Sequence, residues 1–216
     1  MKSILIIGLG RFGRHLCRKF MSLKNEVMIV DRDEAAVTAL ADEATSAQIA
    51  DCTDENALRA LGVKNFDLCF VCIGSDFASS LLITSMLKDM GAARVVAKAS
   101  QDIHAKLLLR NGADDVVYPE RDMAERLASR LLSERIQNLF ELKGDIDIAE
   151  ISLPDSFAGK TVLESEIRKK YKLNIIAISR GKDVITEIRP DEIFDREDKL
   201  IVIGKSENIR KFEAET

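Results

Sequence analysis

The chain has 216 residues, of which 46% are hydrophobic and 31% are charged, and its formal net charge is −4. This length suits one larger domain or two small ones, and the apolar fraction provides enough core for either. The acidic balance leaves no basic footprint for nucleic acid, so we expect no nucleic-acid partner. No stretch approaches the roughly 20 apolar residues of a membrane helix, and the N-terminus leads into a strand instead of a signal peptide. We therefore expect a cytoplasmic protein.

The first predicted elements are a buried strand over residues 3–8 and a helix over 11–23, joined by Gly8-Leu9-Gly10-Arg11-Phe12-Gly13. In such a run the first glycine permits the tight turn, the second lets phosphate approach the backbone, and the third lets the helix pack on the strand. A second strand over residues 26–31 ends at Asp31, close to the offset of roughly 20 residues at which an acid binds ribose hydroxyls. The pattern predicts that the turn binds the phosphates of an adenine nucleotide.

Strands and helices continue to alternate up to residue 118. The pattern predicts helices over 33–43, 54–61, 76–90 and 102–111 and strands over 46–50, 67–73, 94–99 and 115–118. Six strands with helices between them predict an α/β fold, a Rossmann-like doubly wound parallel sheet.

The four cysteines do not indicate a metal or redox site. Cys69 and Cys72 have C-x-x-C spacing, but they fall on a predicted strand, where residues three apart point to opposite faces. Cys17 falls in the first helix and Cys52 in a loop, without further ligands around them. We expect structural thiols.

A long helical pattern follows from Glu120 to about Phe140. Its apolar positions are Met123, Leu127, Leu131, Leu132, Ile136 and Leu139. This stripe needs a partner surface, either a neighbouring subunit or the chain's own sheet.

The order of predicted strands and helices then changes, and it indicates a small α+β domain. Strands are predicted over 147–153, 174–180, 184–188 and 199–204, and helices over 162–171 and 206–213. We place the first domain at residues 1–134, including the crossover helix, and the second at 135–216. The second is small enough to favour stabilisation by dimerisation.

Ligands of a parallel sheet bind beyond the carboxyl ends of its strands. The residues there are Asp31 and Arg32; Asp51, Cys52 and Thr53; Gly74, Ser75 and Asp76; Lys98; and Glu120. Asp51 suits an adenine amino group or a ribose hydroxyl, with a helix N-cap as the alternative. Lys98 suits phosphate, with a solvated surface lysine as the alternative.

Arg11 indicates which nucleotides are expected to bind at this turn. A long cation one turn from the helix N-terminus contributes more to a triphosphate, with nearly four negative charges, than to a pyrophosphate with about two. ATP or ADP is therefore favoured over NAD, although Arg32 beside the ribose acid also suits an NADP phosphate.

The sequence shows no evident residue for acid–base catalysis. His15 and His104 both fall in predicted helices, and the second domain has neither histidine nor cysteine. A nucleotide-binding chain without an acid or base suggests a sensor and not an enzyme. A small NAD(P)-dependent oxidoreductase is the alternative.

The whole pattern resembles the cytoplasmic RCK (regulator of potassium conductance) subunits of Ktr/Trk potassium uptake systems. The resemblance rests on the glycine run and on Val30-Asp31, Ala50-Asp51-Cys52-Thr53-Asp54-Glu55-Asn56, Val71-Cys72-Ile73-Gly74, Val96-Ala97-Lys98-Ala99, Gly112-Ala113-Asp114 and Tyr118-Pro119-Glu120-Arg121-Asp122-Met123-Ala124. In the second domain it rests on Leu153-Pro154, Phe157-Ala158-Gly159-Lys160-Thr161-Val162 and Leu200-Ile201-Val202-Ile203-Gly204.

The resemblance implies a homodimer assembling into a ring, commonly an octamer, attached peripherally beneath an integral-membrane potassium-translocating subunit. It implies that ATP and ADP control that pore, whereas the Trk branch uses NAD(H) more. Arg11 matches the arginine that reaches the triphosphate end, and Asp31 matches the ribose acid. Glu120 matches the glutamate that helps place Mg²⁺ or another divalent cation, with a helix-start acid as the alternative. The predicted nucleotide-binding residues are Gly8, Gly10, Arg11, Phe12, Gly13, Asp31, Arg32, Asp51, Cys52, Thr53, Gly74, Ser75, Lys98 and Glu120.

Some family C-domains also bind cyclic di-AMP. Arg168, Asn174, Ile175 and Pro190 fall near the corresponding segment, where the arginine would meet phosphate and the apolar residues would hold adenine. A plain surface arginine and a turn-forming proline are the alternative.

Overall fold

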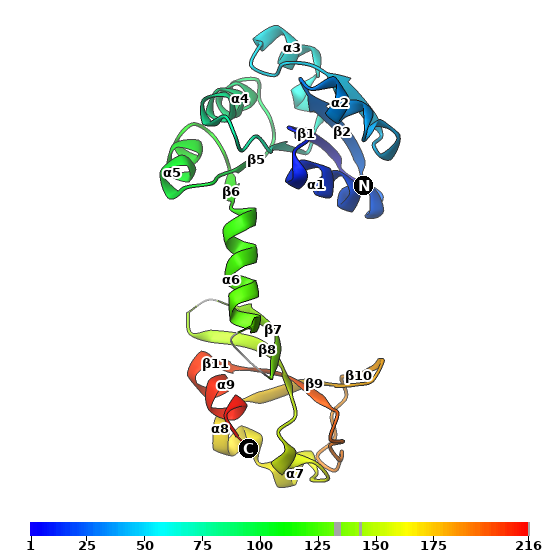
Figure 1. The fold of residues 1–216 in the computed structure, drawn as a ribbon, viewed down its shortest axis with the longest axis vertical. Helices are drawn as coiled ribbons and strands as arrows, with labels where there is room; N and C mark the ends of the chain where they lie inside the picture. Colours follow the sequence, from blue (N-terminus) through cyan, green and yellow to red (C-terminus); the bar gives the residue numbers. More distant parts are fainter. Residues whose placement is uncertain (132–134, 143, 216) are drawn as a thin grey trace. The chain divides into compact units, whose positions relative to one another are not determined.

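The chain folds as two compact units, Met1–Asp122 and Met123–Thr216 (Figure 1). The computed structural model describes residues 1–131, 135–142 and 144–215. The domain boundary expected between residues 134 and 135 falls at the edge of an undescribed segment, and it stays a prediction.

The first unit is built on a six-stranded parallel sheet, as the alternating pattern predicts. Its strands are β1 (Ser3–Ile7), β2 (Glu26–Asp31), β3 (Ser46–Ile49), β4 (Leu68–Val71), β5 (Val95–Lys98) and β6 (Asp115–Val117). They lie in the order β3-β2-β1-β4-β5-β6, so the chain direction across the sheet reverses between β1 and β4. In sheets of this kind a ligand crevice lies at that reversal, beyond the carboxyl ends of the strands.

Helices cover both faces of this sheet. On one face, Cys17 of α1 (Arg11–Ser22) and Val37 of α2 (Glu34–Thr38) belong to the buried core. The other face has its own core, which contains buried residues of α3 (Glu55–Ala60), α4 (Phe77–Asp89) and α5 (Asp102–Arg110). The two cores make the central strands β1 and β4 apolar on both sides, which is why their sequences read as continuous hydrophobic runs.

The C-x-x-C cysteines are structural. Cys69 belongs to the core beneath α3, α4 and α5, whereas Cys72 belongs to the core beneath α1 and α2. Burial raises the pKa of each thiol to about 12, so both are protonated at neutral pH. Within the described residues no cluster of histidine, cysteine or acidic side chains suits a metal ion. The placement of Cys69 and Cys72 in the cores on opposite faces of the sheet confirms the expectation drawn from strand periodicity.

The long helix is shorter than predicted. Helix α6 spans Pro119–Leu131, and the segment predicted to complete it forms strand β7, Ile136–Glu141. β7 pairs antiparallel with β8 (Ile146–Ser152) across a turn that contains Gly144 at φ 78°. The helical prediction to Phe140 is therefore wrong, because spacing at residues 136 and 139 suits a helix but long-range strand pairing overrides it.

The apolar stripe of α6 is open to solvent within this chain. Met123, Leu127 and Leu131 are 61%, 42% and 71% exposed, while Leu132 lies outside the described residues. Among the described segments no helix combines the length and apolarity needed to cross a bilayer.

The second unit contains a five-stranded antiparallel sheet in the order β10-β9-β11-β8-β7. Its further strands are β9 (Asn174–Arg180), β10 (Asp183–Ile185) and β11 (Lys199–Lys205), and α9 (Ser206–Glu213) contacts β8 and β11. Strand β10 ends three residues earlier than predicted. The helix predicted over 162–171 is two short helices, α7 (Val162–Ser165) and α8 (Ile167–Tyr171), because Glu166 between them has φ 49°.

An ionic cluster around the buried Asp198 connects segments of this unit. The Arg180 guanidinium makes two hydrogen bonds to Asp198, at 2.9 Å and 2.8 Å, and a third to Glu192 at 3.1 Å. Asp198 is only 1% exposed and also accepts the Asp195 amide at 2.8 Å. This cluster ties the end of β9 to the loop before β11.

Candidate nucleotide-binding site

Each glycine of the first turn has a separate geometric function. Gly8 has φ 96°, where other residues are strained, and its amide donates to the Val30 carbonyl at 2.9 Å. A Cβ on Gly13 would lie 2.1 Å from the Gly8 carbonyl oxygen, so the helix packs on the turn only because position 13 lacks a side chain. A Cβ on Gly10 would meet nothing within 4 Å. Gly10 therefore faces open space, as a phosphate approach requires.

Helix α1 begins at this turn without a side-chain cap. Gly10 is its N-cap residue, no side chain accepts from the first amides, and the first turn carries no acidic residue. These uncapped N–H groups and the positive end of the helix dipole form an anion-binding position.

Asp31, at the end of β2, braces the glycine turn. One carboxylate oxygen accepts the Leu9 amide at 2.6 Å, and the other accepts the Asp33 amide at 3.0 Å. A carboxylate group offers about four acceptor positions, so acceptor positions of Asp31 stay available to a ligand with hydroxyl groups. Asp31 therefore stabilises the glycine turn and also lines the cavity beside it.

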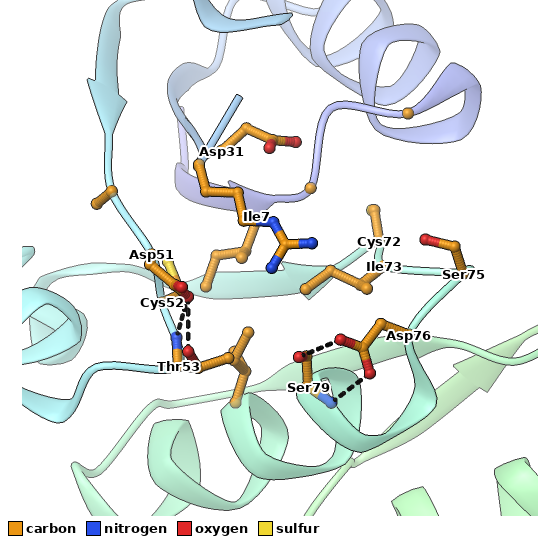
Figure 2. Close-up of a pocket in the computed structure, with 16 residues that line it drawn as sticks. Ile7, Asp31, Asp51, Cys52, Thr53, Cys72, Ile73, Ser75, Asp76 and Ser79 are labelled. Atoms are coloured by element: carbon orange, nitrogen blue, oxygen red, sulfur yellow. Dashed lines mark hydrogen bonds between the residues drawn. The ribbon is translucent and has the colours of Figure 1, made fainter. Parts of the chain in front are cut away.

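A cavity opens at the reversal of strand order, where Figure 2 shows its lining. Its residues are Ile7, Gly8, Gly10, Asp31, Arg32, Ala50, Asp51, Cys52, Thr53, Cys72, Ile73, Gly74, Ser75, Asp76, Ser79 and Ile83. Nine of the predicted nucleotide-binding residues meet there: Gly8, Gly10, Asp31, Arg32, Asp51, Cys52, Thr53, Gly74 and Ser75. Five do not line it: Arg11, Phe12, Gly13, Lys98 and Glu120. Phe12 packs against the core beneath α1.

One wall of the cavity is formed by Asp51. The Thr53 amide and hydroxyl donate to a single Asp51 oxygen at 2.9 Å and 2.7 Å (Figure 2). These bonds hold the pKa of the Asp51 carboxyl below its usual value. The N-cap of α3 is Asp54, so the alternative that Asp51 caps this helix is wrong. The second Asp51 oxygen has no hydrogen bond to this chain's described residues.

The opposite wall contains two residues absent from the predicted set, Asp76 and Ser79. Asp76 caps α4, where it accepts the Ser79 amide at 3.1 Å and the Ser79 hydroxyl at 2.6 Å (Figure 2). These bonds lower the pKa of the Asp76 carboxyl. Asp76 follows its strand in sequence and was a candidate on that ground. Ser79 lies one turn into the helix, and only the fold turns it toward the cavity.

Arg32 supplies positive charge to this acidic crevice. Hydrogen bonds from Thr53 and Ser79 lower the pKa of the Asp51 and Asp76 carboxyls, and the positive charge of the Arg32 guanidinium lowers both further. Both acids are therefore ionised at neutral pH, and the cavity combines carboxylate acceptors with one cation and an apolar floor that includes Ile7 and Ile83.

Lys98 and Glu120 pair with each other beside the cavity. The Lys98 ammonium donates to Glu120 at 2.6 Å, and this bond lowers the pKa of the Glu120 carboxyl, with Arg11 contributing in the same direction. A Cβ on Gly74 would lie 3.2 Å from the Lys98 nitrogen. The Lys98–Glu120 pair thus lies beside the cavity at Gly74, and Arg11 is close enough to act on Glu120 electrostatically.

The second unit has a cavity of about 460 Å³, lined by residues of α7, α8, β9 and the segment 188–190. All four residues predicted for a second ligand line it: Arg168, Asn174, Ile175 and Pro190. Pro190 is distant from the other three residues in the sequence, and the fold brings it to the same cavity.

Fold and site together define a class of protein, a Rossmann-like domain followed by a small five-stranded antiparallel domain, as in RCK proteins. The TrkA-N domain family matches residues 4–119, and the TrkA-C domain family matches residues 148–216.

The curated relatives place the chain within this class. It is 42% identical over 212 residues to Ktr system potassium uptake protein C of Bacillus subtilis (strain 168), which covers 98% of this chain and 96% of that protein. It is 35% identical over 214 residues to Ktr system potassium uptake protein A of the same organism, at 99% and 96% coverage. The chain therefore belongs to the TrkA-N/TrkA-C (RCK) family and is close to the Ktr system potassium uptake proteins. As one of these regulators it is not an enzyme, which confirms the prediction from its missing acid–base residues.

Solved structures show the same fold. The GsuK RCK domain has a TM-score of 0.70 at 21% identity and covers 100% of this chain and 48% of that chain. The GsuK channel bound to NAD has a TM-score of 0.67 at 22% identity, with 100% and 40% coverage. GsuK bound to ADP has a TM-score of 0.54 at 21% identity, with 60% and 34% coverage.

Proposed function

We propose that the chain is the nucleotide-sensing regulatory subunit of a Ktr-type potassium uptake system, in which ATP or ADP in the first unit controls a membrane pore. The observation that carries this proposal is the cavity at the uncapped start of α1, which is lined by both Gly10, with open space beside it, and Asp31. Anion-binding amides and a hydroxyl acceptor at one crevice are the chemistry that an adenine nucleotide requires.

The preference for ATP and ADP is supported by the charges beside the cavity. Arg11 lies near Glu120, and Lys98 lies beside Gly74, so two cations are available to terminal phosphates. A nucleotide with more phosphate charge gains more from them. Binding of NAD and of ADP by GsuK supports an adenine nucleotide in this fold, and NAD(H) is the second candidate ligand.

Glu120 is our proposed protein ligand for Mg²⁺ or another divalent cation. Such an ion usually binds through one or two carboxylates together with phosphate oxygens and water, so one acid at the phosphate end is sufficient. Its engagement with Lys98 means that the ion would need that pair to open.

The proposed assembly is a homodimer that forms a ring, with an octamer as the expected size, on the cytoplasmic side of a membrane partner. The exposed stripe of Met123, Leu127 and Leu131 supports a subunit contact, because three large apolar side chains on one helix face favour burial. A ligand can control the pore only by binding two arrangements of this assembly unequally.

Titration calorimetry of the full chain with ATP, ADP and NADH tests the function. We expect ATP and ADP to bind, and Asp31→Asn to weaken both about 10-fold, because a neutral amide loses charge-assisted hydrogen bonds of about 1.5 kcal/mol. Asp42→Asn is the matched control, since Asp42 is exposed and outside the cavity. Solution scattering should distinguish the ATP and ADP states. Failure of all three nucleotides to bind the wild-type chain would sink the proposal.

We also propose that the cavity of the second unit binds cyclic di-AMP. Arg168 supplies a cation, and Ile175 and Pro190 supply apolar contacts, in a cavity within the size range of small-ligand sites. Two such chains would share one ligand in the proposed dimer.

The expected result is binding of cyclic di-AMP by the wild-type chain and at least 10-fold weaker binding by Arg168→Ala, which removes a charge-assisted phosphate contact. Lys170→Ala is the control, because Lys170 is an exposed cation of the same helix that does not line the cavity. Calorimetry that detects no binding at tens of micromolar ligand, or equal losses in both variants, contradicts this assignment.

A further inference from the structure

An ion pair lies between the strand end beside the cavity and the start of α6. The Lys98 ammonium and a Glu120 oxygen are 2.6 Å apart. The lysine side chain is 14% exposed, whereas the glutamate side chain is 72% exposed. Lys98 is therefore held in place by the fold, and Glu120 is the partner that can leave for solvent at small cost.

Lys98 reaches the crevice at Gly74, which lines the cavity. A methyl group at position 74 would lie 3.2 Å from the Lys98 nitrogen and 3.5 Å from its Cε. The lysine head thus lies against the Cα of Gly74, at the edge of the cavity. An anionic ligand there would meet this ammonium.

The first turn of α6 is held by a second ion pair that lies elsewhere. Arg121 donates to Asp102 at 2.8 Å, and its guanidinium lies 3.6 Å from the centre of the Tyr118 ring. Tyr118 donates to the same Asp102 oxygen at 3.0 Å. None of these three residues lines the cavity, so this attachment is independent of the ligand.

We propose that Lys98 exchanges partners, holding Glu120 in the empty crevice and a nucleotide phosphate in the loaded one, so that loading breaks the Lys98 contact of the first turn of α6 and releases Glu120 for a divalent cation when one is present. This inference rests on the proposed nucleotide function and deepens it. The Lys98 ammonium carries one positive charge, which cannot neutralise both the Glu120 carboxylate and a phosphate, and the phosphates carry the larger negative charge. Helix α6 continues past Asp122, where the first unit ends, so the freed turn belongs to the segment that leads out of the nucleotide domain.

The exchange predicts opposite effects of substituting the two partners. Glu120→Gln removes the competitor for Lys98, so ATP should bind several-fold tighter. Lys98→Met removes the phosphate partner, so ATP should bind at least 10-fold weaker. The double variant should resemble Lys98→Met, because Glu120 competes only through the lysine. A residue that merely supported the fold would not produce a gain in affinity.

The experiment is calorimetry of the full chain with ATP in EDTA, which removes divalent cations and any contribution of Glu120 as a metal ligand. Arg94→Met is the matched control: it breaks the surface pair with Asp115 and should leave affinity unchanged. Amide exchange supplies a second readout. The Asp122 amide, bonded to the Tyr118 carbonyl at 2.9 Å, should exchange several-fold faster with ATP in the wild-type chain and equally fast in Glu120→Gln with or without ATP.

Unchanged or weaker ATP binding by Glu120→Gln in EDTA overturns the exchange. So does an Asp122 amide whose exchange ATP leaves unaltered in the wild-type chain. Either outcome leaves the nucleotide function intact, because wild-type binding is measured in the same titration. Absence of wild-type binding to ATP, ADP and NADH, both in EDTA and with Mg²⁺, would instead overturn the nucleotide function itself.

Discussion

The substitution Gly13→Ala is expected to destabilise the first unit by roughly 3 kcal/mol or more, the upper range for overpacking a close contact. Alanine normally favours a helix interior over glycine by about 1 kcal/mol, so helix propensity alone predicts the opposite sign. The steric clash determines the sign of the change in stability, because the new methyl carbon would lie 2.1 Å from the Gly8 carbonyl oxygen. That neighbour is backbone and cannot rotate away.

Gly10→Ala is the matched variant, and it should cost only about 1 kcal/mol of stability, because Gly10 is the N-cap residue of α1, where alanine is less favourable than glycine. Gly10 has φ −63° and ψ −176°, a conformation open to any residue, and nothing lies within 4 Å of the position of a Cβ. Its effect should fall on the ligand: the methyl group occupies the space where a phosphate would approach, so ATP affinity should drop at least 10-fold.

Urea unfolding followed by circular dichroism measures the first effect, and calorimetry with ATP measures the second. The pair separates folding from binding at two positions of one turn. A Gly13→Ala variant as stable as the wild type would contradict the close contact, and a Gly10→Ala variant with normal ATP affinity would contradict phosphate binding at this turn.

Arg180→Met should destabilise the second unit by about 3 to 5 kcal/mol, the cost of leaving a buried charge without its partner. Asp198 is 1% exposed, and its carboxylate receives two of its three hydrogen bonds from Arg180. The effect should be partly relieved in the double variant with Asp198→Asn, because the neutral amide removes the unpaired charge.

Arg196→Met is the control for this prediction. Arg196 pairs with Asp155, but the two side chains are 77% and 66% exposed, so the loss should stay below about 1 kcal/mol. Urea unfolding of the full chain, with amide exchange along β9 and β11 to assign the unit, compares the three variants. Equal losses for Arg180→Met and Arg196→Met would show that the buried pair does not hold this unit together.

The sequence predicted the first unit in detail because its signals are local. Buried strands that alternate with amphipathic helices predict a parallel sheet. The glycine turn and Asp31 indicate the edge of that sheet at which a ligand would bind. The same reasoning failed at residues 136–140, where helical spacing continued but Phe140 pairs with Ile148 on β8. A pairing between two strands is not encoded by the periodicity of either strand alone.

The candidate site was predictable where residues directly follow strands. Asp51 and Thr53 fall into this group, and they line the cavity. Ser79 was missed, because a residue one turn into a helix has no strand-end signal and faces the cavity only through the packing of α4. The Lys98–Glu120 pair was also missed, although both residues were candidates, since their contact depends on how β5 and α6 meet.

By itself the sequence determined the fold class, the nucleotide-type turn and the residues available at the edge of the sheet, because strand burial, glycine spacing and strand ends are properties of neighbouring positions. The tertiary structure decided which of these residues share a cavity and which partner each one has. Asp51 is free of the α3 cap, and Lys98 is bound to Glu120. Such choices depend on distances between segments far apart along the chain, and only packing fixes those distances.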